Sequence, residues 1–116
     1  MERYIEYLKK YRDTEISKAV LEEVLNGAKA VSLVEVYAIN LIDVLNKYSA
    51  KEIDDVFLLE WVNTIWFSEW YFYNEDQCDS IASVMNVLEE LDEGELVLNQ
   101  EKIEMLVNAL KNNSEI

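Results

Sequence analysis

Apolar residues recur every three to four positions along most of the chain, which is the spacing of one face of an α-helix. The first such stripe ends near Asp13 or Thr14, either of which suits the cap of a second helix. Its members are Tyr4, Ile5, Leu8 and Tyr11. The second stripe is followed by Gly27, at a point where glycine often ends a helix because it adopts a positive φ without strain. Its members are Ile16, Val20, Leu21, Val24 and Leu25.

Three segments have the pattern of a capping box, in which the first side chain caps a helix and the fourth bonds back to it. They are residues 32–35, 49–52 and 74–77. The apolar residues after the first box surround so much of the helix that we predict a central, buried position for it. Near the C-terminus, Gly94 is a predicted helix stop, and Asn99 is the predicted cap of the last helix.

The pattern therefore predicts an all-α fold, a compact bundle of five or six helices that forms a single domain over residues 1–116. One segment is ambiguous, because residues 65–73 are rich enough in aromatic side chains to suit a strand. We predict that this segment is helical, since no other segment is predicted to be a strand with which it could pair.

Composition narrows the chemistry that is available to the chain. Half of the residues (51%) are hydrophobic, which excludes a disordered chain despite the net charge of −14. The chain contains no His and a single Cys, so the commonest general base and zinc ligands are missing. No phosphate-binding loop or nucleophile motif is present. We predict a non-enzymatic protein without a cofactor or a metal ion.

The N-terminal sequence lacks the basic and apolar regions of a secretory signal, and no apolar run is long enough to cross a membrane. We therefore expect a cytoplasmic protein in a reducing environment. Cys78 is then a small apolar helix residue, because its acidic neighbours would disfavour a reactive thiolate.

The negative charge is concentrated in the second half of the chain. Residues 1–50 contain seven basic and eight acidic residues, whereas residues 51–116 contain three basic and sixteen acidic ones. No Lys or Arg occurs between Glu52 and Glu101. Because like charges repel one another, this concentration of acidic residues lowers the stability of the fold. Binding of a cationic partner is one reason to retain the acidic residues, and solubility is the other. The same charge argues against binding of nucleic acid or of an anionic membrane.

Aromatic residues are concentrated in the same half, with eight of thirteen between Phe57 and Tyr73. At about 100° per residue, a helix distributes these rings around its circumference and cannot bury all of them on one side. Most should be core residues, and one or two remain to anchor a partner. The candidates for these anchors are three rings, which we predict to bind a Lys- and Arg-rich protein together with an acidic rim. The predicted residues are Glu69, Trp70, Tyr71, Tyr73, Glu75, Asp76 and Asp79.

The sequence Trp70-Tyr71-Phe72-Tyr73-Asn74-Glu75-Asp76 resembles the small acidic helical immunity proteins that neutralise bacterial nuclease toxins. The colicin-nuclease members of that class bind a basic enzyme through paired tyrosines flanked by acidic residues. The resemblance implies that Tyr71 and Tyr73 are the anchors. This chain departs from that pattern, because the two tyrosines are not adjacent and no Pro follows them.

The leading hypothesis is a protein inhibitor, an immunity protein that covers the substrate-binding surface of a cationic toxin domain. One alternative is a phage-type anti-defence protein that mimics DNA, and another is a helical scaffold whose aromatic residues form a homodimer. A carboxylate-dependent enzyme, with a pair such as Glu60 and Glu69, ranks last because 24 acidic residues make such pairs common by chance. The acidic residues at 89–93 lack both the EF-hand and the di-iron pattern.

Overall fold

A computed structural model describes residues 2–93 and 98–116. These residues form six α-helices, a short 3₁₀ helix and a two-stranded parallel sheet. In chain order the elements are α1 (Glu2–Arg12), α2 (Lys18–Leu25), β1 (Val34–Val36), α3 (Ala38–Ser49), α4 (Asp55–Phe67), β2 (Tyr71–Tyr73), α5 (Cys78–Glu89), the 3₁₀ helix η1 (Glu90–Glu93) and α6 (Gln100–Lys111). The predicted helical class is confirmed.

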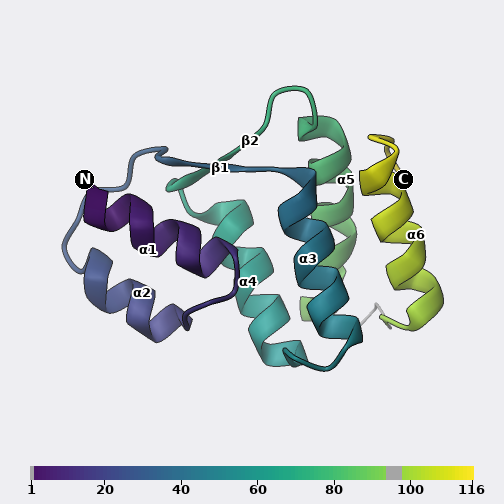
Figure 1. The fold of residues 1–116 in the computed structure, drawn as a ribbon, viewed down its shortest axis with the longest axis horizontal. Helices are drawn as coiled ribbons and strands as arrows, with labels where there is room; N and C mark the ends of the chain where they lie inside the picture. Colours follow the sequence, from purple (N-terminus) through teal and green to yellow (C-terminus); the bar gives the residue numbers. More distant parts are fainter. Residues whose placement is uncertain (1, 94–97) are drawn as a thin grey trace.

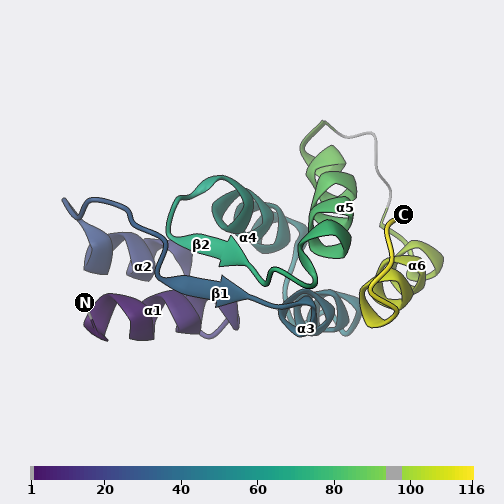
Figure 2. The same cartoon turned by 90° about the horizontal axis from the view of Figure 1, so that it is seen from above.

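The helices form two groups, with the small sheet along one edge of the molecule. α1 and α2 pack against each other at one end, while α3, α4, α5 and α6 form the rest of the bundle (Figure 1). α3 contacts α4, α5 and α6, so its predicted central position is confirmed. Figure 2 shows β1 and β2 side by side, and in Figure 1 the segment that joins β2 to α5 projects beyond the sheet.

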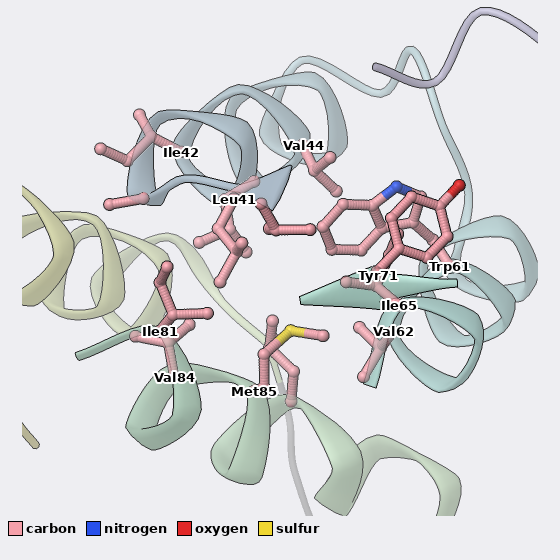
Figure 3. Close-up of a cluster of buried hydrophobic side chains, with 14 of the residues drawn as sticks. Leu41, Ile42, Val44, Trp61, Val62, Ile65, Tyr71, Ile81, Val84 and Met85 are labelled. Atoms are coloured by element: carbon pink, nitrogen blue, oxygen red, sulfur yellow. The ribbon is translucent and has the colours of Figure 1, made fainter. Parts of the chain in front are cut away.

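Buried apolar side chains from both groups of helices and from the sheet form a single cluster. Figure 3 shows the part of it to which α3, α4, β2 and α5 contribute, including Leu41, Val44, Trp61, Ile65, Tyr71 and Met85. Burial of one such side chain stabilises a fold by about 1.5–3 kcal/mol. Because the sheet pairs only three residues of each strand, this cluster rather than the strand pairing stabilises the fold.

The prediction that residues 65–73 are helical is wrong in its second half. α4 ends at Phe67, and β2 pairs in parallel with β1 in the register Val34↔Tyr71. The partner strand lies within a segment that we assigned to the start of a helix. β-branched residues in β1 and aromatic residues in β2 both favour strands, and the helices α3 and α4 provide the long crossover that parallel strands require.

The predicted capping boxes do not cap helices. The first one leads into β1, and α3 begins only after Tyr37, whose backbone N–H donates to the Asn40 side chain at 2.8 Å. At the second, α3 continues to Ser49, and α4 is capped instead by the Asp54 carboxylate, which accepts from the Phe57 N–H at 2.8 Å. At the third, α5 begins later, at Cys78. The two residues of a capping box do not determine where a helix starts when tertiary packing favours a different start.

Two other helix ends agree with the prediction from the sequence, and one does not. Gly27 follows α2 with a φ of 76°, and the Asn99 side chain caps α6 by accepting from the Lys102 N–H at 2.8 Å. The cap of α2 is Ser17 rather than Asp13 or Thr14. The predicted stop at Gly94 lies outside the described residues. Within residues 2–93 and 98–116, no helix has the length and apolar character to cross a membrane.

Candidate protein-binding surface

Two of the three aromatic residues that we predicted as anchors lie in the core. Trp70 is 9% exposed and Tyr71 is 6% exposed. The Tyr71 hydroxyl donates to the backbone oxygen of Leu8 at 2.7 Å, and burial raises the pKa of this hydroxyl. The Trp70 ring packs edge-on against Tyr4, with 6.0 Å between ring centroids. The expectation that these two rings are available on the surface is therefore corrected: they hold β2 against α1.

The third ring, that of Tyr73, is only partly exposed. It packs edge-on against Trp66 of α4, with 6.4 Å between ring centroids. Its hydroxyl oxygen is buried and has no hydrogen-bond partner among the described residues. Burial raises the pKa of this hydroxyl. Tyr73 thus contributes mainly to packing between the sheet and α4.

All four predicted acidic residues are exposed, but they do not form one ring of charge. Glu75 and Asp76 lie in the turn after β2, and Asp79 lies in the first turn of α5. Glu69 lies before β2, at the opposite end of the strand, where its backbone oxygen accepts from the Ser32 hydroxyl at 3.3 Å. We refer to Glu75 and Asp76 as the acidic turn.

The exposed face of the sheet carries four side chains, of which none was predicted as a site residue. Glu35 lies opposite Phe72 in the register of the two strands. Side chains two residues apart on a strand share a face, so Tyr37 follows Glu35 and Asn74 follows Phe72 on this side. Phe72 is 43% exposed and Tyr37 is 39% exposed. We refer to Glu35, Tyr37, Phe72 and Asn74 as the sheet-face cluster; the acidic turn continues from it along the chain.

Hydrogen bonds fix the carboxylate at the centre of the sheet-face cluster. Glu35 Oε1 accepts from the Tyr37 hydroxyl at 2.9 Å, and Glu35 Oε2 accepts from Asn74 Nδ2 at 3.0 Å. The bond to Glu35 raises the pKa of Tyr37, because the carboxylate favours the protonated hydroxyl. The cluster therefore presents a carboxylate of fixed orientation on the same face of the sheet as two exposed rings.

Three basic side chains of the first half of the chain are engaged in contacts within the protein. The Arg12 guanidinium donates to both carboxylate oxygens of Asp13, at 3.0 and 3.3 Å, and to the backbone oxygen of Glu35 at 2.9 Å. Lys47 Nζ donates to Thr14 Oγ1 at 2.6 Å, and Lys18 Nζ donates to Thr64 Oγ1 at 2.7 Å.

Carboxylates of the candidate surface have no such cationic partners in the described part of the chain. Among the described residues, the ion pairs are Lys10–Glu6 and Arg12–Asp13, and neither includes a residue of the sheet-face cluster or of the acidic turn. The negative charge of Glu35, Glu75 and Asp76 is therefore not neutralised by a salt bridge to any described residue. This surface combines unpaired carboxylates with exposed aromatic rings.

In the described part of the chain, neither the Glu60–Glu69 pair nor a group of metal ligands has the arrangement of a catalytic or metal-binding site. Glu60 and Glu69 are both exposed, whereas catalytic carboxylates are usually buried. No three Cys, Asp or Glu side chains of residues 2–93 and 98–116 are grouped so that they could hold a metal ion. A surface cavity of about 430 Å³ lies where α4 and α6 begin, and its Asp55 carboxylate accepts from the Tyr48 hydroxyl.

Alternation along β1 was the signal that could have identified the Glu35 and Tyr37 side of the sheet-face cluster. The residues Val34-Glu35-Val36-Tyr37 alternate between apolar and polar or amphipathic side chains, which is the period of a half-buried strand. The capping-box pattern at residues 32–35 overlaps this alternation and favours a helix instead. The polar side of this alternation is the side that the fold exposes.

Comparison with known protein families, with curated proteins and with solved structures finds no match to this chain.

Proposed function

We propose that this chain is a non-enzymatic inhibitor of a basic protein, most specifically an immunity protein that neutralises a cationic, nuclease-type bacterial toxin. One observation carries the proposal: among the described residues the acidic turn and Glu35 have no salt-bridge partner, while the exposed rings of Phe72 and Tyr37 share the face of the sheet that carries Glu35. Aromatic residues are enriched at the energetic centres of interfaces. Carboxylates around them would pair with Lys and Arg of the partner.

A nuclease binds phosphates with a basic surface, so an inhibitor can occupy that surface with carboxylates in place of phosphates. The uneven charge of the chain also supports this mode of action. An acidic surface attracts a basic partner over a distance of about one Debye length, roughly 8–10 Å at physiological salt. Electrostatic attraction of this kind accelerates association, which benefits an inhibitor that must bind before the toxin acts.

The test is capture of a partner by the immobilised full-length chain from a lysate of the source cell, followed by mass spectrometry. Three forms are compared: the wild type, the double variant Glu75→Lys/Asp76→Lys, and the control Glu22→Lys/Glu23→Lys. The control makes the same change of net charge at two exposed residues of α2, at the other end of the molecule from α5 (Figure 1). We expect a basic protein to bind the wild type and the control but not the first variant.

The captured protein is then purified and titrated with the wild type at increasing salt. We expect the dissociation constant to rise at least about tenfold between 50 and 300 mM salt, because surface charge pairs are screened. A partner that is not basic, or one that binds the Glu75→Lys/Asp76→Lys variant as well as the wild type, would contradict the proposal. A host nuclease in place of a toxin would favour the anti-defence alternative.

A further inference from the structure

The sheet-face cluster has a geometry that selects among basic side chains. Its central carboxylate, that of Glu35, accepts one hydrogen bond on each oxygen, from the Tyr37 hydroxyl and from Asn74 Nδ2. Each carboxylate oxygen has two acceptor positions. One position on each oxygen therefore remains for a further donor, and the two remaining positions belong to a carboxylate whose orientation is already fixed.

Both groups that fix this carboxylate are uncharged, so its negative charge is retained. The Arg12 guanidinium also bonds to Glu35, but it donates to the backbone oxygen and not to the carboxylate. Its ion pair is with the carboxylate of Asp13. A carboxylate that is already held in place loses little side-chain entropy when a cation binds to it.

An exposed ring lies directly beside this carboxylate. Phe72 is the register partner of Glu35, and its side chain is 43% exposed on the same face of the sheet. Tyr37, two residues along β1 from Glu35, adds a second exposed ring. A cation that reaches Glu35 therefore meets an aromatic surface at the same time.

We infer that the sheet-face cluster recognises an arginine side chain of a basic protein partner. This inference rests on the proposed function, because that function supplies the basic protein. A guanidinium group is planar and donates two parallel N–H groups to one carboxylate, while its face stacks on an aromatic ring. The ammonium group of lysine is a compact charge that lacks the fork and the planar face. The acidic turn attracts either cation, whereas Glu35 and Phe72 distinguish between them.

The test titrates the full-length, isotope-labelled chain with N-acetyl-arginine methylamide and, separately, with N-acetyl-lysine methylamide, and follows backbone amide signals by two-dimensional NMR. We expect the arginine compound to shift the signals of residues 34–37 and 71–74. We also expect its dissociation constant to be about five-fold lower than that of the lysine compound, because it adds a second charge-assisted bond and ring stacking.

Three variants separate the contributions of Glu35, of Phe72 and of the acidic turn to the binding of the two compounds. Glu35→Gln keeps the shape of the side chain and should abolish the preference for arginine. Phe72→Leu keeps an apolar side chain without a ring and should weaken arginine binding about three-fold while lysine binding changes little. The matched control Glu75→Gln/Asp76→Gln should weaken both compounds by the same factor. Circular dichroism checks that each variant is folded, and Phe72→Leu alone tests the inference if Glu35→Gln loses helicity.

Equal affinities of the two compounds for the wild type, or shifts that are centred on another acidic surface, would overturn the inference. In that case the proposed function still stands if capture of a basic protein depends on Glu75 and Asp76. Conversely, an arginine preference that depends on Glu35, together with capture of no basic protein, would support the arginine site and contradict the proposed function.

Discussion

The hydroxyl of Tyr71 donates a hydrogen bond of 2.7 Å to the backbone oxygen of Leu8, and this bond joins β2 to α1 across 63 positions of the chain. The ring that carries the hydroxyl is buried in the same cluster as Trp61 of α4 (Figure 3). Tyr71 is thus a structural residue, which determines how a substitution at this position acts.

Tyr71→Ala should lower the free energy of unfolding by about 3–5 kcal/mol, because it removes a buried ring and leaves a cavity. Tyr71→Phe removes only the hydrogen bond and should cost about 1 kcal/mol. Urea unfolding monitored by circular dichroism measures both values. A Tyr71→Ala variant that is as stable as the wild type would contradict the position of this ring in the core.

At Tyr73 the substitution of Tyr by Phe should not lower the free energy of unfolding, in contrast to Tyr71→Phe. Its buried hydroxyl has no partner among the described residues, so Tyr73→Phe removes an uncompensated polar group. We expect the free energy of unfolding to stay the same or to rise by up to about 1 kcal/mol. The Tyr71→Phe variant is the matched control, since it loses an identical atom that is hydrogen-bonded. A loss of 1 kcal/mol or more at Tyr73 would show that its hydroxyl is satisfied.

Alkaline pH should destabilise the fold. Burial raises the pKa of Tyr11 to about 12 and also raises the pKa of Tyr71 and Tyr73, whereas the same side chains titrate near 10 in the unfolded chain. Above pH 10 the unfolded state therefore binds fewer protons than the folded state, and stability falls as pH rises. Each tyrosine contributes at most about 1.4 kcal/mol per pH unit, and for Tyr11 the loss continues to about pH 12.

Urea unfolding at pH 8, 9.5, 10.5 and 11.5 measures this dependence, with tyrosinate absorbance recorded in parallel. In the double variant Tyr71→Phe/Tyr73→Phe the decline should be shallower, because two of the titrating groups are gone. A free energy of unfolding that is constant between pH 8 and 11.5 would contradict the burial of these hydroxyls.

Arg12 should matter for stability more than an ordinary surface cation. It joins the end of α1 to β1 by donating to the Glu35 backbone oxygen, and it pairs with the carboxylate of Asp13. Its side chain is 14% exposed. Arg12→Ala should cost about 2 kcal/mol, because both acceptors lose a charged donor. Arg12→Lys retains the charge but not the fork of donors, so its cost should be about half of this. Thermal unfolding compares the two variants, and equal stability of Arg12→Ala and the wild type would contradict this role.

The positions of the helices were largely predictable, whereas the positions of the predicted site residues were not. The spacing of Leu8, Tyr11 and Leu21 identified buried faces correctly, because a helix repeats its faces through local geometry alone. For the site, residue type identified the exposed acidic turn but assigned Tyr71 to the wrong environment. A tyrosine is enriched both in cores and in interfaces, so its type does not distinguish between them.

By itself the sequence determined the helical class, the C-terminal end of α2 and the start of α6, and the separation of a nearly neutral half from an acidic one, because these depend on local periodicity, local capping and composition. Only the tertiary structure decided that residues 34–36 and 71–73 form a sheet, since the two strands lie far apart in the chain and neither is stable without the other. That pairing also decided the candidate site. It directs Tyr71 into the core and Phe72 to the surface, because neighbouring residues on a strand point to opposite faces.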